Sequence, residues 1–494
     1  MSKLKKYQSR FNIAGAALSG LGVYIAVLQT APFLVWIALV PLFLVLGGQP
    51  RSDHRYSGFI PGLVAGGTFS VFAFVWMISG AHTFTGAAVG YGIAIFLLCV
   101  IVFSLSCALL LWRTPLALIA PVWVLAETAV QWGAEKMPWF LFHIGYALAG
   151  DLYAIQPVSV IGVTGAGFVV ILVNYLVATA ILRRSWTSAL APLLLTGGYM
   201  LWGWWLLPPP EKDGALEKDR GSSFSLAMVT ENIPPEIPWD STNGNRRVQQ
   251  LLQQEDICIA AHPRMILWSE SAIPWTWSPD DDLVKELLSH SRQRSITHVL
   301  GMNTAVSAGV VRNSAYCLLP DGKVAGRYDK EYALLFIEQP WLGLQFPFLS
   351  SDGYSVEPGD SDLPLTTPDG KAGVLICNES ALPAAAARRV RQGARFLLNM
   401  SNDGWFRDTW LVKQHFYNAR LRAVETRKDI AVNSNNGWSG CIDASGRIDT
   451  TGFLFTIHPN DRLTAAVRCP LIPVYSCLLF ILSIIIINKK PSIL

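Results

Sequence analysis

The segment GVLICNE, residues 373–379, determines how the C-terminal half of this chain folds. Its apolar residues are typical of a buried β-strand, which delivers Cys377 at its C-terminal end. An alanine-rich run over 384–391 follows and predicts a helix. Because strands that lead into helices in this way build α/β domains, we expect one here.

Two segments upstream have a related form. The run MILWSE ends an apolar strand on Glu270, and the run GRYDK places Lys330 shortly after a hairpin turn predicted at 320–323. Functional residues of α/β sheets gather at the carboxyl ends of strands. We therefore expect Glu270, Lys330 and Cys377 to meet in one pocket.

The three side chains together suit covalent acyl chemistry. A cysteine attacks a carbonyl carbon as its thiolate, and a nearby glutamate can take its proton and later protonate the leaving group. A lysine can stabilise both the thiolate and the oxyanion, and the backbone N–H of Asn378 at a helix start is a second oxyanion donor. Each residue alone is common in cores or on surfaces, so the hypothesis depends on the ordered set Glu270, Lys330 and Cys377.

The chain on either side of this domain is strongly apolar. Of its 494 residues, 51% are hydrophobic and 15% are charged, whereas soluble proteins carry about 25% charged residues. Runs long enough, or nearly so, for a bilayer span occur at 11–29, 31–47, 58–79, 86–111, 115–132, 157–181, 187–207 and 472–488. We therefore predict a multi-span α-helical membrane domain of about eight transmembrane helices, seven before the α/β domain and one after it.

The distribution of basic residues predicts the orientation. With the N-terminus in the cytoplasm, the inside segments hold Lys3, Lys5, Lys6, Arg10, Arg51, Arg55, Arg113, Arg183, Arg184, Lys489 and Lys490. The outside loops between the spans hold only Lys136. Since cytoplasmic loops carry the excess of Lys and Arg, we expect both termini inside and the α/β domain outside.

These patterns divide the chain into four parts. Helices one to seven occupy 1–208, a polar linker 209–222, the catalytic domain 223–468, and the last helix with its tail 469–494. An aromatic-rich segment over 133–156 falls in an outside loop. It is either an interfacial aromatic belt or a wall along which a lipid substrate reaches the site, with Trp139 and Phe140 as its candidate contacts.

Other patterns exclude several classes of function. The eight cysteines form no CxxC pair, and the eight histidines show no metal-ligand spacing, so we expect neither a metal nor a cofactor. A net charge of +4 does not indicate nucleic acid. No motif couples His415 to Cys377, and we interpret His415 as a satisfied core histidine or a hydrogen-bonding one.

The order and context of Glu270, Lys330 and Cys377 resemble the nitrilase superfamily, and the fused membrane region resembles the apolipoprotein N-acyltransferase family. The resemblance implies an αββα sandwich. It makes Glu270 the general base, Lys330 the stabiliser of oxyanion and thiolate, and Cys377 the nucleophile. It also implies supporting positions for Glu338 and Glu379, eight residues after the lysine and two after the cysteine.

Further segments carry the same resemblance, and some depart from it. Matches lie at 232–234 with Trp239, at 401–406 with Trp405, and at 414–415, 419–420 and 435–437. We expect Trp239 and Trp405 to contact substrate. The family pattern Pro-Phe-Gly-Glu is replaced by LFIE at 335–338, an aromatic residue by Asn378, and Gln-Gly-Asn by TEN at 230–232. These changes surround the acyl pocket, so they affect the identity of the substrate more than the chemistry.

The resemblance implies acyl transfer in two half-reactions. Its partners would be a phospholipid acyl donor, a diacylglyceryl lipoprotein acceptor and the bilayer, for a monomer in the bacterial inner membrane with its catalytic domain in the periplasm. One alternative is a membrane-bound nitrilase-like amidase or hydrolase, with water as the second nucleophile. Another is a relative of the conjugal-transfer type that uses the nitrilase fold as an assembly scaffold.

Overall fold

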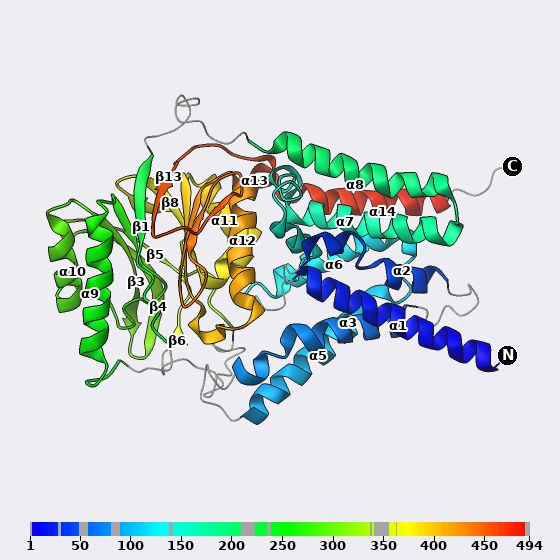
Figure 1. The fold of residues 1–494 in the computed structure, drawn as a ribbon, viewed down its shortest axis with the longest axis horizontal. Coiled ribbons are helices and arrows are strands. Elements are labelled where there is room, and N and C mark those ends of the chain that lie inside the picture. The colour runs from blue at the N-terminus through cyan, green and yellow to red at the C-terminus, as the bar shows by residue number, and fades with distance from the viewer. Residues whose placement is uncertain are drawn as a thin grey trace.

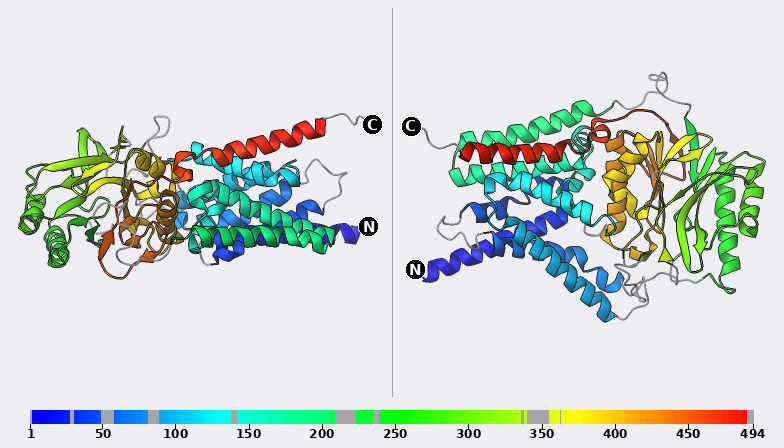
Figure 2. Two further views of the ribbon diagram at one scale, coloured as in Figure 1. Left: turned by 90° about the horizontal axis from the view of Figure 1, so that it is seen from above. Right: turned by 180° about the vertical axis from the view of Figure 1, so that it is seen from behind.

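The computed structural model of this chain joins a region of apolar helices to an α/β domain (Figure 1). It describes residues 2–27, 31–48, 58–80, 89–137, 142–208, 223–234, 239–335, 338–339, 355–361 and 363–489. The side chains of 2–10, 405 and 487–489 lie outside this description. Figure 2 shows from two further sides that the helical region and the α/β domain lie end to end.

The helical region forms at all of the predicted apolar runs. It contains α1 (Ser2–Val27), α2 (Val40–Gly47), α3 (Phe59–Phe74), α5 (Val89–Leu111), α6 (Ile119–Gly133), α7 (Val158–Arg183), α8 (Trp186–Leu206) and α14 (Ile472–Lys489). The short helices η1 (Pro32–Trp36), η2 (Leu116–Leu118) and η4 (Ile144–Gly150) connect them. Large apolar side chains such as Leu98 and Leu194 point outward and are 60% and 71% exposed, which suits a lipid surface and not water.

Length and apolar composition distinguish two groups among the described helices. Three are long enough to cross a membrane: Val89–Leu111, Leu116–Gly133 and Val158–Arg183. Four shorter apolar helices cover Phe11–Val27, Pro32–Gly47, Phe59–Phe74 and Ile472–Ile486. The predicted region of apolar helices is therefore confirmed, and the count of about eight crossings stays a prediction.

Two sheets stack face to face in the α/β domain. The first contains β13 (Leu454–Ile457), β1 (Phe224–Met228), β2 (Met265–Leu267), β3 (Thr297–Ser307), β4 (Val310–Leu318) and β5 (Val324–Asp329) in that order, with β6 (Ser355–Val356) paired to β4. The second has the order β12 (Ile448–Asp449), β11 (Gly440–Ile442), β10 (Ile430–Asn435), β9 (Phe396–Asn402), β8 (Gly370–Ile376) and β7 (Leu365–Thr367). The hairpin predicted at 320–323 joins β4 to β5.

Helices cover both outer faces of the paired sheets. The helices α9 (Gly244–Ala260) and α10 (Asp282–Arg292) lie on the first sheet, and α11 (Pro383–Arg391) and α12 (Trp410–Thr426) lie between the second sheet and the helical region (Figure 1). Along β8, Val374 and Ile376 pack between the sheets, while Leu375 packs toward α11 and α12. Successive strand residues point to opposite faces, so an unbroken apolar run fills both cores. The predicted αββα sandwich is confirmed.

Most of the described part of the aromatic-rich segment is buried within the protein, and its side of the membrane stays a prediction. Residues 144–149 form most of η4 and are at most 1% exposed. The Tyr146 hydroxyl donates to the Ala381 carbonyl at 2.7 Å, and the Arg420 guanidinium donates to the Ala149 carbonyl at 2.6 Å. Tertiary packing against α12 therefore buries a segment whose composition suited an interface with lipid. Trp139 and Phe140 lie outside the described residues.

Side chains of the α/β domain also complete the backbone hydrogen bonding of α7. The helix is interrupted at Gly162, whose φ of +64° is in the left-handed region that favours glycine. The Glu425 carboxylate accepts from the Val163 N–H at 3.0 Å, and the Arg422 guanidinium pairs with Glu425 at 2.8 Å. The Val163 N–H, which has no acceptor within α7 after the interruption, is thus capped by a side chain of α12.

Arg427, at the end of α12, fastens the α/β domain to the helical region. Its guanidinium donates to Gln156 Oε1 at 2.7 Å, to the Ala444 carbonyl at 3.1 Å and to the Leu206 carbonyl at 3.2 Å. Substituting Arg427→Met leaves these acceptors without their donor in a largely buried place. Loss of each buried hydrogen bond destabilises by about 1–3 kcal/mol.

We expect Arg427→Met to lower the unfolding temperature of the purified full-length protein by several degrees in a fluorescence thermal-shift measurement. Arg292→Met is the matched control, because Arg292 is exposed at the end of α10. It should change the unfolding temperature little, as surface substitutions usually do. Equal unfolding temperatures for the two variants would contradict this account of the contact.

Candidate active site

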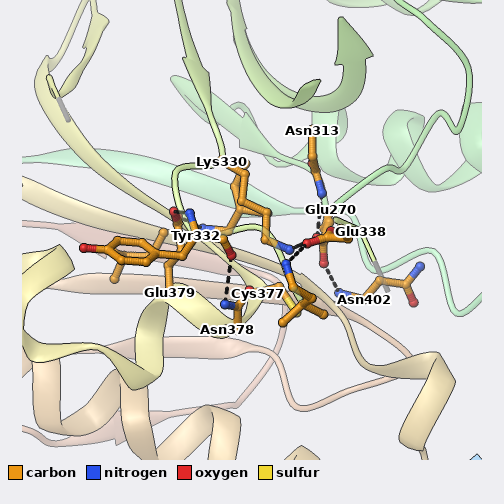
Figure 3. A network of polar contacts seen from close by, with 12 residues as sticks. Glu270, Asn313, Lys330, Tyr332, Glu338, Cys377, Asn378, Glu379 and Asn402 are labelled. Atoms are coloured by element: carbon orange, nitrogen blue, oxygen red, sulfur yellow. Dashed lines mark hydrogen bonds and ion pairs between the residues drawn. The ribbon is translucent and has the colours of Figure 1, made fainter. Parts of the chain in front are cut away.

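The structure brings Glu270, Lys330 and Cys377 into one place between the sheets (Figure 3). Cys377 is the first residue of η6 (Cys377–Ala381), directly after β8. Glu270 follows β2, Lys330 follows β5, and Lys330 Nζ lies 3.4 Å from Glu270 Oε1. Because β8 and β9 are parallel, as are β1, β2 and β3, the carboxyl ends of these strands deliver both Cys377 and Glu270.

Three groups orient the Glu270 carboxylate, of which Lys330 is one. The Asn313 amide donates to its Oε1 at 2.8 Å, and the Asn402 backbone N–H donates to its Oε2 at 3.0 Å. Burial raises the pKa of the Glu270 carboxyl, the Lys330 charge opposes that shift, and the charge of Glu338 adds to it. A carboxylate with a raised pKa is a better proton acceptor than an exposed one, which is what a general base requires.

Lys330 is buried between two carboxylates. Its Nζ donates to Glu338 Oε1 at 2.9 Å as well as to Glu270, and the side chain is 0% exposed. Burial alone would lower the pKa of Lys330, but Glu338 and Glu270 outweigh it, so the net pKa lies above the ordinary value. Lys330 therefore keeps its positive charge at neutral pH beside the sulfur.

The surroundings of Cys377 favour the neutral thiol over the thiolate. Burial raises the pKa of the Cys377 thiol well above its ordinary value, Glu270 raises it further, and Lys330 opposes both. The residue has a φ of +52°, a conformation that costs of order 1 kcal/mol or more outside glycine and that recurs at functional sites. A thiol of this kind becomes nucleophilic only as it loses its proton, and Glu270 is the adjacent acceptor.

Glu379 joins the backbone around Lys330 to the backbone around Cys377. Its carboxylate accepts from the Tyr328 hydroxyl at 2.8 Å, from the Glu331 N–H at 2.9 Å and from the Ile376 N–H at 2.8 Å. Arg389 Nη2 lies 3.4 Å from the same carboxylate, and both side chains are 0% exposed. Glu379 thus fixes the distance between the segments that carry the ammonium and the sulfur.

Asn378 adds a second link between these segments. Its side-chain amide donates to the Tyr332 carbonyl at 3.0 Å (Figure 3). Its backbone N–H lies at the start of η6, directly after the nucleophile, where the sequence predicted an oxyanion donor. The oxyanion role of this N–H stays a prediction.

Three contributors to the site escaped the sequence analysis. Asn313 lies on β4, where a buried amide in a strand is unusual and was the one available signal. Asn402 acts through its backbone N–H, which no side-chain pattern reveals. Arg389 lies behind Glu379, and its charge looked like an ordinary part of the basic face of a helix.

The structure gives no direct evidence on the four residues predicted to contact substrate. Trp239 packs on the α9 side of the first sheet, with its ring 5.3 Å from Trp275 and the Arg247 guanidinium 5.0 Å above it. Trp405 belongs to η7 (Asp403–Phe406), and its side chain lies outside the described part of the chain. The substrate roles of Trp239, Trp405, Trp139 and Phe140 stay predictions.

His415 forms the kind of contact that the sequence analysis expected. Its Nδ1 lies 2.9 Å from Asp403 Oδ1, and its side chain is 12% exposed. His415 is partly buried, and of the two expected forms the structure shows the hydrogen-bonding one. The negative charge of Asp403 also raises the pKa of Cys377. Its effect is smaller than those of burial, Glu270 and Lys330.

Two family models match this chain, one after the other. The model described as "Apolipoprotein N-acyltransferase N-terminal domain" matches residues 19–176, and the model described as "Carbon-nitrogen hydrolase" matches residues 226–457. The first falls within the helical region and the second within the α/β domain. The order of the two models along the chain is the order of its two structural regions.

Similar proteins match along most of their length. The apolipoprotein N-acyltransferase of Gloeobacter violaceus is 29% identical over 472 residues, which are 89% of this chain and 86% of the relative. That of Geobacter metallireducens is 27% identical over 444 residues, 84% and 82% of the two chains. A crystal structure of a carbon-nitrogen hydrolase from Helicobacter pylori G27 aligns with 52% of this chain and 95% of its own, at 15% identity and a TM-score of 0.36. The two models and the full-length relatives show that this chain is similar to apolipoprotein N-acyltransferases along most of its length.

Proposed function

We propose that this protein transfers a fatty-acyl chain from a phospholipid, through a thioester on Cys377, to the α-amino group of the N-terminal diacylglyceryl-cysteine of a lipoprotein. The observation that carries the proposal is the convergence of Glu270, Lys330 and Cys377 in a chain that is similar to apolipoprotein N-acyltransferases along most of its length. Both substrates are lipids, and each methylene removed from water is worth about 0.8 kcal/mol, so an enzyme anchored among apolar helices reaches them where they reside.

The first half-reaction forms the thioester. The Cys377 sulfur bonds to the ester carbonyl carbon of the phospholipid while Glu270 takes the thiol proton. The Lys330 ammonium and the Asn378 N–H stabilise the oxyanion. The carbon–oxygen bond then breaks, Glu270 returns the proton to the glycerol oxygen, and a lysophospholipid leaves.

The second half-reaction passes the acyl group from Cys377 to the lipoprotein amine. The lipoprotein α-amine attacks the thioester carbonyl, and Glu270 takes the proton that the nitrogen must lose. The carbon–sulfur bond breaks, an amide is released, and the sulfur of Cys377 recovers its proton from Glu270. Because the same carboxyl serves as base and then as acid in each half, a raised pKa suits it to both tasks.

The relatives favour this proposal over the alternatives from the sequence analysis. All of the similar curated proteins given above are acyltransferases by name. A hydrolase would release free fatty acid or ammonia without any amine acceptor. An assembly scaffold would keep its cellular role in a Cys377→Ala variant.

The proposal includes an orientation in the bacterial inner membrane, with both termini in the cytoplasm and the α/β domain in the periplasm. In support, α1 begins and α14 ends at the end of the helical region away from the α/β domain (Figure 1). Gly47 lies against Leu116 and Leu182, so the turn at Arg113 and the end of α7 at Arg183 lie together. On this view the helical part is 1–208, the linker 209–222, the catalytic domain 223–468, and the final helix and tail 469–494.

An acyl-enzyme trap tests the function. Full-length protein incubated with phospholipid vesicles should gain the mass of one fatty-acyl group, and peptide mapping should place it on Cys377. The Cys377→Ala variant should gain none. Cys469→Ala is the matched control, because Cys469 is exposed and lies outside the site, and it should acylate like the wild type. A wild type that never acylates, or a Cys377→Ala variant that acylates equally, contradicts the proposal.

The pH dependence of acylation tests the role of Glu270. Since burial raises the pKa of Glu270, the base is lost as the pH falls through a value above the ordinary pKa of about 4.3. The single-turnover rate should therefore decline on the acidic side with a midpoint above that value. Glu270→Gln should remove this decline and slow acylation by about 10²- to 10⁴-fold.

The control for this measurement is Glu357→Gln, which alters a carboxylate that is 41% exposed and paired with Arg312. It should leave both the rate and the acidic midpoint unchanged. An acidic decline that persists in Glu270→Gln at the wild-type midpoint would assign the titration to another group.

A third test concerns Tyr146, which positions the nucleophile turn from the helical region. Tyr146→Phe removes the hydrogen bond to the Ala381 carbonyl, worth about 1 kcal/mol, and should slow acylation about fivefold with little change in KM. Tyr199→Phe is the matched control, because its buried hydroxyl donates to the Ala154 carbonyl at 2.9 Å within the helical region. Equal acylation rates in both variants would remove the positioning role.

A further inference from the structure

A cavity of about 140 Å³ lies inside the helical region, apart from the Cys377 site. Residues of α1, α2, α3, α5 and α6 line it, together with the segment 142–144. Its wall is almost entirely apolar, with Val23, Leu42, Phe69 and Phe103 among the lining side chains. A cavity of this composition favours an aliphatic group over water, because water needs two to four polar partners.

Exposed residues of both α5 and α6 line the cavity, which favours an opening between these two helices. Ser106 on α5 and Val130 on α6 line it, and both are exposed. The neighbouring surface of α5 is apolar, since Leu105 and Leu109 are 41% and 57% exposed. An opening surrounded by such side chains faces lipid and not water, so a chain from the bilayer can enter sideways.

One polar cluster interrupts the apolar wall. Glu127 on α6 accepts from Trp123 Nε1 at 2.8 Å and from the Ile144 N–H at 3.0 Å, and its other oxygen lies 3.2 Å from His143 Nδ1. Gln131 Oε1 lies 2.8 Å from His143 Nε2. Ionisable residues within apolar membrane helices are rare and indicate a functional site, such as the path of a substrate or an ion. A carboxylate has about four lone-pair positions, and these three contacts leave one for a ligand donor.

We propose that this cavity binds a single alkyl chain of a membrane lipid, which enters between α5 and α6, and that Glu127 and His143 receive an N–H or O–H group of the same lipid. The apolar wall provides affinity for the chain, and the polar cluster limits how far the lipid slides in. The proposal rests on the acyl-transfer function only for the choice of a lipid substrate.

The polar end of the cavity is connected to the nucleophile turn. The ring of His143 lies 5.2 Å from the ring of Tyr146, whose hydroxyl donates to the Ala381 carbonyl at the end of η6. A lipid held by Glu127 and His143 is therefore placed beside the element that supports Cys377. This position suits a substrate that waits next to the site that consumes it.

Photocrosslinking tests the site directly. Full-length protein in lipid nanodiscs is loaded with a phosphatidylethanolamine that carries a diazirine in one acyl chain, and adducts are mapped by mass spectrometry. We expect adducts on the cavity-lining residues of α3, α5 and α6, competed by excess unlabelled lipid. Ala126→Phe fills the cavity and should reduce these adducts at least fivefold. Ala129→Phe is the matched control on the same helix, exposed and away from the lining, and should keep them.

A second variant and a second background make each outcome informative. Glu127→Gln keeps the size of the side chain and should shift the adducts along the cavity, which a purely structural role of Glu127 would not do. All mapping is repeated in Cys377→Ala, where no thioester can form and the cavity adducts should persist. If Cys377 acylates but the adducts fall equally on all outward surfaces and ignore Ala126→Phe, the cavity site is wrong and the acyl transfer stands. Cavity adducts without any acylation of Cys377 would overturn the acyl transfer alone.

Discussion

The site depends on one buried ammonium placed between two carboxylates. Lys330 contacts Glu270 on one side and Glu338 on the other. All three side chains are largely buried, so solvent screens their charges only weakly. Removing one partner of such a buried group leaves an uncompensated charge, which destabilises by about 3–5 kcal/mol. The same ammonium holds Glu270 ionised enough to act as a base and offers positive charge to the sulfur of Cys377. The charge of Lys330 therefore both stabilises the folded site and assists the reaction.

The arrangement is held by backbone contacts from distant parts of the chain. Glu379 ties the residues around Lys330 to the turn at Cys377, and Arg422 Nη1 donates to the Ser380 carbonyl at 3.2 Å within that turn. Tyr146 supports the end of the same turn from the helical region. The helices that anchor the enzyme among lipids thus also shape the nucleophile.

The departures from the family pattern leave this framework intact. In LFIE at 335–338, the glutamate still reaches Lys330, and its second oxygen accepts from the Leu334 N–H at 2.5 Å. Asn378, which replaces an aromatic residue, uses its amide to hold the Tyr332 carbonyl. Glu231, in the altered segment at 230–232, is buried and accepts from the Ser269 N–H at 3.1 Å, one residue before Glu270. Burial raises the pKa of Glu231 to about 7. Asn378 and Glu231 therefore both hold backbone groups next to the reacting residues.

The sequence by itself determined the helical runs, the strands that end on Glu270 and Cys377, and the hairpin before Lys330. These are local properties, because hydropathy and strand periodicity are written in neighbouring residues. Only the tertiary structure decided three features of the site. Asn313 and the Asn402 N–H orient Glu270, Glu379 joins the Cys377 turn to the segment after Lys330, and η4 is buried. The reason is physical: these contacts join groups as far as 271 residues apart in the chain, as Ala149 and Arg420 are. No local pattern specifies which buried donor meets which acceptor, because that choice is made only when the sheets stack and the helices close against them.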